Sequence, residues 1–250
     1  MLRIENLIKV YPNGTRALNG VSLKIPTGQF VAVIGLSGSG KSTLMRCINR
    51  LIEPTSGRVF LDDVEITAAT DLRPVRRRIG MIFQDFNLVR RSSVLTNVLC
   101  GRLGYRSSLA SLFHLFPPED YEDARACLAR VGLSDKESQR ADTLSGGQQQ
   151  RVGIARALMQ KPDVILADEP VASLDPATAH TVLDHLEQMN KRDGMTVVCN
   201  LHFLSLARRY SDRVVGLKAG EIVFDGGPHE IDDERFKQIY GQDAEQVEIA

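Results

Sequence analysis

The chain has 250 residues, of which 43% are hydrophobic and 25% are charged, and its 31 basic and 31 acidic side chains give a formal net charge of zero. This composition is typical of a globular protein with a sizeable core, and the balanced charge excludes a protein that coats nucleic acid. The four cysteines are widely spaced and form no CxxC pair, so we expect reduced thiols rather than disulfides or a metal cluster. No apolar stretch reaches the ~18 residues of a membrane-spanning helix.

The N-terminal part is predicted to consist of strands. Residues 2–35 alternate short strand patterns with the turn signals Pro12-Asn13-Gly14 and Pro26-Thr27-Gly28. The continuous apolar run at 30–34 is typical of a parallel strand that is buried on both faces. We therefore expect an antiparallel β part that leads into a buried parallel strand.

A glycine-rich loop follows this strand. Its pattern, G-x-x-x-x-G-K-[ST], is matched at every fixed position by residues 35–42, and a helical pattern runs from Ser42 to about residue 52. Glycines let the backbone approach a ligand closely, and backbone N–H groups with a helix N-terminus attract anions. Lys41 is expected to reach the β- and γ-phosphates of a nucleoside triphosphate, and the Ser42 hydroxyl to ligate Mg²⁺. The alternative is a Gly/Ser-rich turn without a ligand, which the complete match disfavours.

The next part of the chain divides into a core and an insertion. Strands are predicted at 59–61 and 79–83, whereas residues from about 92 to 140 are mostly helical in pattern, with a turn at Pro117-Pro118. We expect an α/β fold with a P-loop NTPase core, which is a mostly parallel sheet with helices and an N-terminal antiparallel β part, and an inserted helical lobe. The predicted boundaries are 1–88 and 146–240 for the RecA-like ATP-binding core, about 89–145 for the lobe, and about 241–250 for a frayed tail.

The segment that resumes the core at Ser145 has two interpretations. A helix is predicted from Gly146 to about Gln160, and Ser145 suits its N-cap position. The same serine hydroxyl, the N–H groups of Gly146 and Gly147 and the helix N-terminus can also form a second anion site. A capped helix alone is the simpler reading, and the phosphate loop upstream favours the second.

Two carboxylates follow the buried strand predicted at 164–167. Asp168 is placed to hold Mg²⁺ through water, although an acidic pair after a strand is by itself usually a solvated turn. Asp175 is predicted to cap the next helix, with Pro176 at its first position. Later elements are a helix end near Asp193-Gly194, a strand at 196–199 and a hairpin of 214–217 with 221–224.

With the segment Leu144-Ser145-Gly146-Gly147-Gln148, these motifs resemble the nucleotide-binding subunit of ATP-binding-cassette (ABC) transporters, from about residue 2 to about residue 240. The resemblance implies an ATPase that uses ATP and Mg²⁺. It implies that Glu169 polarises the attacking water, that Gln84 touches Mg²⁺ and senses a membrane partner, and that His202 contacts the γ-phosphate. Taken alone, a glutamine after a strand or a lone histidine is more often structural.

The resemblance also implies contacts between two copies of the chain. Ser145 to Gln148 would close over the γ-phosphate held by the opposite subunit, and Asp175 would lie in a loop that crosses the dimer interface. Tyr11 would stack on adenine, with packing at a strand edge as the alternative. The implied nucleotide-binding residues are Tyr11, Gly35, Ser37, Gly38, Ser39, Gly40, Lys41, Ser42, Thr43, Ser145, Gly146, Gly147, Gln148 and Asp175. The implied catalytic residues are Lys41, Gln84, Glu169 and His202, and the implied metal ligands are Ser42, Gln84 and Asp168.

Within this family the chain looks most like the ATPase of phosphonate importers, with the similar phosphite and hypophosphite importers close by. The segments that carry this likeness are 86–89, 93–98, 101–104, 168–176 and 223–226. Phe203 departs from the usual pattern, because a polar residue commonly follows the histidine, and Arg90-Arg91 stands where one arginine is commoner. These departures bear on the subgroup and leave the ATPase assignment intact.

The resemblance further implies a location and an assembly. The chain would be peripheral on the cytoplasmic face of a bacterial inner membrane, as a homodimer with two transmembrane permease subunits and, indirectly, an external solute-binding protein, without a nucleic-acid partner. The alternatives are an ATPase for another small solute, such as an amino acid or a metal, or an exporter ATPase. A DNA-associated ABC ATPase would need long heptad repeats between the two motifs, a translation-type factor usually has two cassettes, and a P-loop kinase would lack residues 144–148.

Residues from about 84 to 104 are expected to line a groove for a short cytoplasmic helix of the permease. Phe86 and Leu88 are apolar for a connecting loop, which favours a docking role, whereas Leu95 and Leu99 are expected to pack inside the lobe. The basic residues at 73–78 and Arg90-Arg91 are predicted to form a solvated face.

Overall fold

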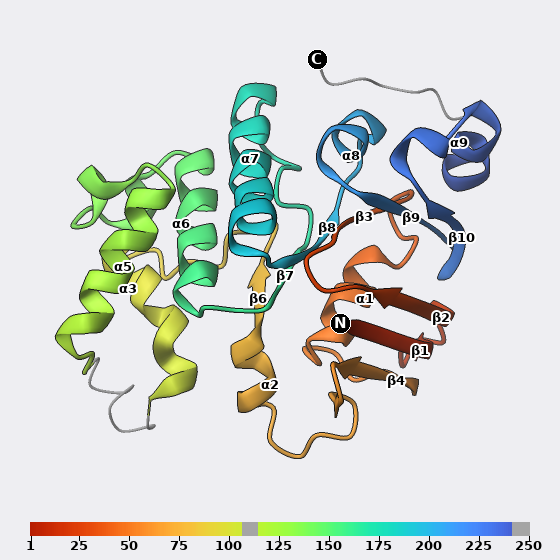
Figure 1. Cartoon of the computed structure of the whole chain (residues 1–250), viewed down its shortest axis with the longest axis horizontal. Coiled ribbons are helices and arrows are strands. Elements are labelled where there is room, and N and C mark those ends of the chain that lie inside the picture. Colours follow the sequence, from red (N-terminus) through yellow and green to blue (C-terminus); the bar gives the residue numbers. More distant parts are fainter. Residues whose placement is uncertain (107–114, 242–250) are drawn as a thin grey trace.

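The computed structural model describes residues 1–106 and 115–241, and its strands form two sheets (Figure 1). One is a four-stranded sheet of order β2-β1-β4-β5, and the other is a six-stranded sheet of order β10-β9-β3-β8-β7-β6. The strands are β1 (Leu2–Val10), β2 (Arg16–Ile25), β3 (Phe30–Ile34), β4 (Ser56–Leu61), β5 (Val64–Glu65), β6 (Ile79–Ile82), β7 (Val164–Ala167), β8 (Thr196–Asn200), β9 (Arg213–Lys218) and β10 (Glu221–Gly226). The first sheet is antiparallel, and in the second only β10 is antiparallel to its neighbour. The predicted α/β class is confirmed.

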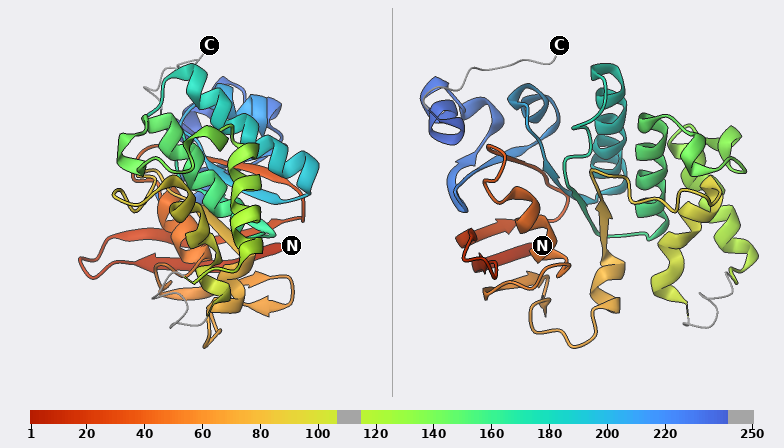
Figure 2. Two further views of the ribbon diagram at one scale, coloured as in Figure 1. Left: turned by 90° about the vertical axis from the view of Figure 1, so that its left-hand side faces the viewer. Right: turned by 180° about the vertical axis from the view of Figure 1, so that it is seen from behind.

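The helices fall into three groups along the molecule (Figures 1 and 2). The α-helices are α1 (Lys41–Ile48), α2 (Arg73–Arg78), α3 (Val94–Leu99), α5 (Pro118–Arg130), α6 (Gly146–Met159), α7 (Pro176–Asp193), α8 (Leu204–Tyr210) and α9 (Asp233–Tyr240). Short 3₁₀ turns are η1 (Cys100–Tyr105), η2 (Ser134–Lys136), η3 (Ala141–Thr143) and η4 (Pro228–Glu230). The helices α3, α5 and α6 gather at one end, α9 lies at the other end beside β9 and β10, and the remaining helices lie between. None of the helices in the described ranges is long and apolar enough to cross a membrane.

The six-stranded sheet is buried on both faces, and each face has its own apolar cluster. Alternate residues of a strand point to opposite faces. In β3, Phe30, Ala32 and Ile34 join the cluster formed with α6, α7 and α8, while Val31 and Val33 join the cluster formed with α1 and the N-terminal sheet. All five residues are fully buried, which explains why the strand is a continuous apolar run.

The parallel strands bring four connecting segments to one edge of the sheet. Val33 of β3 is aligned with Asn200 of β8, and Ala167 of β7 is aligned both with Cys199 of β8 and with Ile82 of β6. The carboxyl ends of these strands therefore lie together, and the residues that follow them share a crevice. This is the edge at which ligands of open α/β sheets bind.

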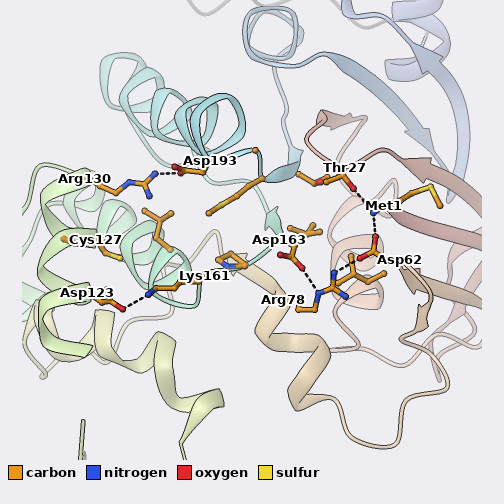
Figure 3. A pocket seen from close by; sticks show the side chains of 18 residues that line it. Met1, Thr27, Asp62, Arg78, Asp123, Cys127, Arg130, Lys161, Asp163 and Asp193 are labelled. Atoms are coloured by element: carbon orange, nitrogen blue, oxygen red, sulfur yellow. Dashed lines mark hydrogen bonds and ion pairs between the residues drawn. The ribbon is translucent and has the colours of Figure 1, made fainter. Parts of the chain in front are cut away.

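At the opposite edge, a cavity of about 590 Å³ lies between the helical end, the sheet and the N-terminal β part (Figure 3). Arg130 of α5 pairs with Asp193 at the end of α7, and Lys161 pairs with Asp123 of α5 at 2.7 Å. The charged side chains that line this cavity pair with one another, so their charges are already neutralised. We interpret this region as a joint between the helical lobe and the core.

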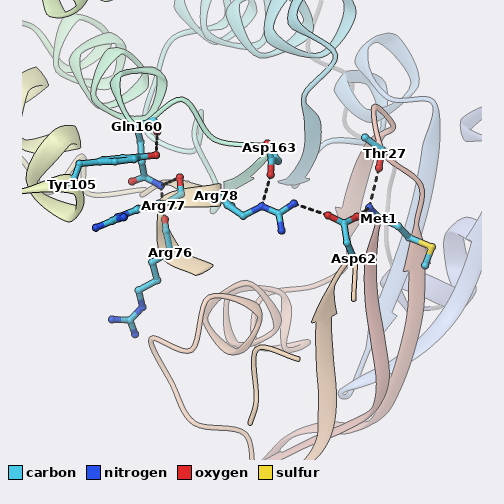
Figure 4. A network of polar contacts seen from close by, with 9 residues as sticks. All are labelled: Met1, Thr27, Asp62, Arg76, Arg77, Arg78, Tyr105, Gln160 and Asp163. Atoms are coloured by element: carbon cyan, nitrogen blue, oxygen red, sulfur yellow. Dashed lines mark hydrogen bonds and ion pairs between the residues drawn. The ribbon is translucent and has the colours of Figure 1, made fainter. Parts of the chain in front are cut away.

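Three arginines at the end of α2 extend this joint (Figure 4). Arg78 contacts Asp62 and Asp163 at 2.5 Å each, Arg77 donates to the backbone oxygen of Gly104 at 2.6 Å, and Arg76 donates to that of Arg50 at 2.7 Å. The prediction of a solvated basic face is therefore wrong for these three side chains. Their sequence pattern could not show this, because their partners lie in distant parts of the chain.

Several boundaries differ from the sequence-based expectation. The helix after the glycine-rich loop ends at Ile48, because the backbone at Arg50 adopts a positive φ of 47° that no α-helix contains. Pro117 is the N-cap of α5 and Pro118 is its first residue, which agrees with the predicted turn. Residues 107–114 of the predicted lobe and 242–250 of the predicted tail lie outside the described part of the chain.

Candidate functional site

The glycine-rich loop begins where β3 ends and encloses a lysine. Gly35 has a φ of 145°, and a Cβ atom there would lie 2.1 Å from the backbone oxygen of Leu217, so only glycine fits. Lys41 is buried, and its Nζ donates to the backbone oxygens of Gly35 at 2.8 Å and Leu36 at 3.1 Å. Burial lowers the pKa of Lys41, while the negative charges of Glu169 and Asp168 act in the opposite direction. A buried cation thus lies within the loop.

Backbone and hydroxyl donors complete the loop. Ser39 is buried, and its Oγ has no hydrogen-bond partner in the described structure. Its backbone is held in place, because the Ser39 N–H donates to the Leu36 oxygen at 3.1 Å and the Ser39 oxygen accepts from the Gly220 N–H at 2.9 Å. Helix α1 begins directly after Gly40, so the N–H groups of its first turn open towards the loop. A lysine, a buried hydroxyl and a helix N-terminus together form a cradle for a polyanion.

Asp168 is the acceptor at the centre of the site. It follows β7 and is almost fully buried. Its Oδ1 accepts hydrogen bonds from Ser42 Oγ and from Asn200 Nδ2, both at 2.7 Å, and its Oδ2 lies 3.6 Å from an Nη atom of Arg46. Two elements therefore hold one carboxylate: α1, which carries both Ser42 and Arg46, and β8, which carries Asn200.

Glu169 and His202 form a second pair beside the first. His202 Nε2 lies 2.8 Å from Glu169 Oε2, and the side chains are 34% and 15% exposed. Glu169 has a φ of 52°, which is rare for a residue with a side chain and is found at functional sites more often than elsewhere. Tyr240 donates from its hydroxyl to the backbone oxygen of His202 at 3.1 Å. The structure thus brings together the predicted catalytic residues Lys41, Glu169 and His202.

The donor set around Asp168 fits a magnesium ion. Mg²⁺ prefers oxygen ligands and is usually bound through one or two carboxylates together with substrate phosphates. The hydroxyl of Ser42 and the carboxylate of Asp168 already touch, and the buried Oδ1 of Asn200 beside them has no hydrogen-bond partner in the described residues. No group of three or more His, Cys, Asp or Glu residues suited to a metal exists in the described ranges, so a dedicated protein cage is absent there.

The aromatic residue predicted to contact the nucleotide lies beside the loop helix. The hydroxyl of Tyr11 is 3.2 Å from the Thr43 hydroxyl, and Lys9 Nζ lies 5.4 Å from the centre of its ring. Tyr11 is half-buried. It is therefore held next to α1, where a base attached to a bound triphosphate could reach its ring.

The segment from Ser145 to Gln148 lies apart from the residues described so far. Ser145 and Gln148 form a capping box at the start of α6, and Ser145 and Gly146 are exposed. A Cβ atom on Gly147 would lie 2.3 Å from a Thr178 methyl group on α7, so glycine is required for this close approach. Asp175 caps α7 by accepting from the Thr178 backbone, as predicted. In the described structure no hydrogen bond or ion pair joins residues 145–148 to the glycine-rich loop.

Gln84 follows β6 at the same edge of the sheet but is not part of the central contacts. No hydrogen bond in the described residues links it to Ser42 or Asp168, and it lines a hollow of about 380 Å³ that also includes Phe86, Leu88 and Ser173. The segment that follows it is unusual, because Phe86 and Asn87 have φ values of 59° and 48°.

Arg156 of α6 holds this unusual backbone. Its guanidinium donates to the backbone oxygens of Phe86 at 2.9 Å and Asn87 at 2.6 Å. Burial lowers the pKa of Arg156, although a guanidinium stays charged at neutral pH. Helix α6, which Ser145 caps, is thereby fixed to the loop that begins at Gln84.

Sequence reasoning missed four residues of this site: Arg46, Arg156, Asn200 and Tyr240. Asn200 offered a signal, since it is a polar residue at the end of an apolar strand and two positions before His202. The other three contact the site through backbone oxygens or at longer distance from separate helices. No spacing in the sequence indicates such contacts.

Comparisons with known proteins agree with this geometry. The ABC transporter family model matches residues 18–172. A protein of Bdellovibrio bacteriovorus named "Phosphonates import ATP-binding protein PhnC" is 56% identical over 250 residues, covering 99% of this chain and 96% of its own length. The protein of the same name from Shouchella clausii is 54% identical, covering 100% of this chain and 94% of its own.

A solved structure shares the fold. It is the dimeric structure of a post-hydrolysis state of an ATP-binding cassette bound to ADP and Pi, with a TM-score of 0.81 and 37% sequence identity, covering 91% of this chain and 99% of the other. The two cassettes therefore share an architecture along nearly their whole length. On these matches, and on the motifs that the fold brings to one edge of its parallel sheet, the chain belongs to the ABC transporter family, as one of its ATP-binding cassette ATPases.

Proposed function

We propose that the chain is the ATP-hydrolysing subunit of an ABC importer for phosphonates or related reduced phosphorus oxyanions. The observation that supports this most directly is the pair of contacts Ser42–Asp168 and Glu169–His202, which places a hydroxyl, two carboxylates and an imidazole beside a phosphate cradle. The solute class is supported by the relatives named for phosphonate import, because the transported solute touches other subunits.

In this proposal each residue has a task that its position permits. The loop 35–43 and the ammonium of Lys41 bind the β- and γ-phosphates of ATP. Mg²⁺, held by Ser42 and Asp168 and approached by Gln84, would neutralise phosphate charge. Glu169 orients and polarises the attacking water, and His202, in contact with it, is placed to touch the γ-phosphate. Tyr11 contacts the base.

We further propose that two copies of the chain enclose two ATP molecules. Ser145 and Gly146 are exposed at the N-terminus of α6 and do not touch their own glycine-rich loop in the described structure. An exposed helix N-terminus whose capping residue is a serine can bind an anion that comes from outside the chain. The dimeric cassette with 37% sequence identity supports this arrangement, in which Asp175 and its loop would lie near the interface.

The docking surface for a membrane subunit is proposed at the end of α1. A hollow of about 230 Å³ there is lined by Leu51, Met81, Phe83 and Gly101, among others, and Leu51 and Leu103 are 45% and 37% exposed. Part of it belongs to the predicted region 84–104. Leu88, by contrast, packs against the core together with Leu95, and Leu99 is buried, so a charge at Leu88 is expected to destabilise the chain itself. The better positions to test docking are therefore Leu51, which lines the hollow, and the exposed Leu103, which lies in the predicted region two residues after the lining residue Gly101.

The proposed location is the cytoplasmic face of a bacterial inner membrane, in contact with two permease subunits. The test is co-purification of the chain with its membrane subunits and reconstitution in liposomes with the external solute-binding protein. Phosphonate-loaded binding protein should stimulate ATP hydrolysis, whereas an amino acid or a metal ion should not. Transport in the liposomes without any requirement for a binding protein would indicate an exporter and overturn the proposal.

Leu51→Glu and Leu103→Glu should leave folding and ATP binding of the isolated chain intact and abolish assembly with the permease. Val64→Glu is a matched control, because Val64 is 47% exposed on the N-terminal sheet and belongs neither to the residues that line the hollow nor to the predicted region 84–104. Normal assembly of both leucine variants would place the docking surface elsewhere.

A further inference from the structure

The last residue of the C-terminal helix contacts the loop that carries His202. Helix α9 ends at Tyr240, whose hydroxyl donates to the backbone oxygen of His202 at 3.1 Å. Burial raises the pKa of Tyr240, and the nearby backbone of Gly35 acts in the opposite direction. One phenol therefore lies between the first residue of the glycine-rich loop and the backbone of the histidine.

The helix is anchored firmly enough to hold this hydroxyl in place. Ile239 is fully buried, and Gly216 of β9 leaves room for it, since a Cβ atom there would lie 2.8 Å from Ile239. The rings of Phe236 and Tyr240 lie with their centres 4.6 Å apart, and Lys218 donates to the backbone oxygen of Gln238 at 2.8 Å. The ring of Tyr240 is thus fixed by packing, independently of its hydroxyl.

We propose that Tyr240 is a positioning residue for hydrolysis, whose hydroxyl holds the backbone of His202 against the start of the glycine-rich loop so that the imidazole stays on Glu169. This inference rests on the proposed ATPase function. It gives helix α9 a role in the site through two contacts: the Tyr240 hydroxyl bonds to the His202 backbone, and the His202 imidazole contacts Glu169. Tyr240 does not touch the reacting atoms.

Tyr240→Phe is the test, because it removes the hydroxyl and keeps the ring that packs on Phe236. The loss of one hydrogen bond to the positioned loop is expected to lower kcat about 3- to 10-fold. The dissociation constant for ATP should change by less than about 2-fold, because the phosphate cradle is intact. A residue that merely anchors α9 would lower thermal stability and leave kcat unchanged.

Tyr210→Phe is the matched control. Tyr210 also has a hydrogen-bonded phenol, which contacts His180 Nδ1 at 2.8 Å and Asp184 Oδ1 at 3.0 Å on α7, away from the nucleotide site. Its replacement should lower the melting temperature and leave kcat as in the unaltered chain. A fall in kcat for Tyr240→Phe but not for Tyr210→Phe supports the proposal.

A double-mutant cycle with His202→Ala separates positioning from general damage. If Tyr240 acts through His202, Tyr240→Phe should lower the residual rate of His202→Ala by less than about 2-fold. The inference is overturned if Tyr240→Phe has the kcat of the unaltered chain. It is also overturned if Tyr240→Phe lowers kcat as strongly in the His202→Ala variant as in the unaltered chain.

Hydrogen exchange of the nucleotide-free chain reports the contact without any turnover. Peptides that cover residues 34–37 and 201–204 should exchange faster in Tyr240→Phe and at the normal rate in Tyr210→Phe. If the unaltered chain did not hydrolyse ATP, the proposed function would fail. The hydrogen-exchange experiment would then still decide whether Tyr240 fixes the two loops. Unchanged exchange overturns the inference in either case.

Discussion

Asn200 donates through Nδ2 to Oδ1 of Asp168 at 2.7 Å, across the carboxyl ends of the adjacent strands β8 and β7. One residue beyond Asp168, Glu169 meets His202, which lies two residues beyond Asn200. The two loops are thus joined twice, once through the proposed metal ligand and once through the proposed base. A displacement of either loop changes both contacts.

Removal of the Asn200 amide is expected to weaken metal binding. Asn200→Ala leaves Asp168 with Ser42 and the more distant Arg46, so the carboxylate loses one of the two donors at 2.7 Å that fix its orientation. Loss of an outer-shell partner typically costs about 10- to 100-fold in metal affinity. Binding of Mn²⁺ in the presence of ATP, followed by electron paramagnetic resonance, measures this directly.

Asn190→Ala is the control for that experiment. Asn190 is also buried, and its Nδ2 donates to the backbone oxygens of Gly28 and Met195 near the amino end of β8. Its replacement should lower stability and leave Mn²⁺ affinity unchanged. Equal losses of affinity in the two variants would show that the Asn200 effect is a general loss of structure.

Glu169→Gln should abolish steady-state hydrolysis while ATP still binds. The amide cannot polarise water, whereas Lys41, Ser42 and the loop that hold the phosphates are unaltered. Turnover should fall by at least about 100-fold, and nucleotide should be trapped in a stable dimer, which gel filtration with radiolabelled ATP detects. Near-normal turnover would assign the base to another residue.

Lys41→Ala should fail earlier, at nucleotide binding. The variant loses a buried cation whose charge-assisted hydrogen bonds to phosphate contribute about 1.5–3 kcal/mol each, or about 10- to 100-fold in affinity. Titration of the chain with ATP and Mg²⁺ by calorimetry is the measurement. An unchanged dissociation constant would be incompatible with the cradle.

Mixed dimers can show whether each site draws on two chains. A Ser145→Arg subunit paired with a Lys41→Ala subunit should retain one intact site and have one doubly altered site, because each proposed site combines Lys41 of one chain with Ser145 of the other. Isolated heterodimers should therefore trap nucleotide at one site. Trapping at neither site would mean that both residues serve the same chain's nucleotide.

Cys47 predicts a pH dependence of stability. Burial raises the pKa of this fully buried thiol from 9.0 to about 11. Between these values the unfolded chain releases the thiol proton while the folded chain keeps it, so the free energy of unfolding falls as pH rises, by at most about 1.4 kcal/mol per pH unit. Cys47→Ala should have a shallower decline over pH 9–11 and an unchanged slope near pH 7. Urea unfolding at each pH provides the comparison, and identical slopes above pH 9 would contradict the assignment.

The buried strand β3 and the glycine-rich loop after it could be predicted from the sequence because burial and backbone geometry restrict which residues fit there. Strand β3 is buried on both faces, so its five apolar residues form an unbroken run, and the loop after it is constrained by geometry to glycine at Gly35. Asp168 was expected at the carboxyl edge of the sheet because it directly follows a buried strand, and parallel strands deliver their carboxyl ends to one edge. Glu169 and His202 were expected beside it only through the resemblance to ABC ATPases, and the structure places their side chains 2.8 Å apart.

Residues that act across the chain could not be placed in this way. Arg76 and Arg77 bind backbone oxygens far away in the sequence, and a backbone oxygen leaves no residue type to recognise. Leu88 looked like a docking residue because it is apolar in a connecting loop, yet its side chain packs against the core. Tyr240 carries no motif, and only the docking of α9 brings it to His202.

Arg156 and Ser145 lie on the same helix, one holding the Phe86–Asn87 backbone and the other exposed at the N-terminus. At a rise of 1.5 Å per residue, roughly 16 Å of α6 separates them. If a membrane subunit binds the hollow proposed for docking, which Arg156 also lines, more tightly in one position of α6, that position also changes how strongly Ser145 binds a phosphate. Linkage makes the effect reciprocal: nucleotide must alter the affinity of the membrane subunit by the same factor by which the membrane subunit alters the affinity of nucleotide. Measuring either affinity in the presence and absence of the other ligand therefore gives the coupling free energy of the assembly.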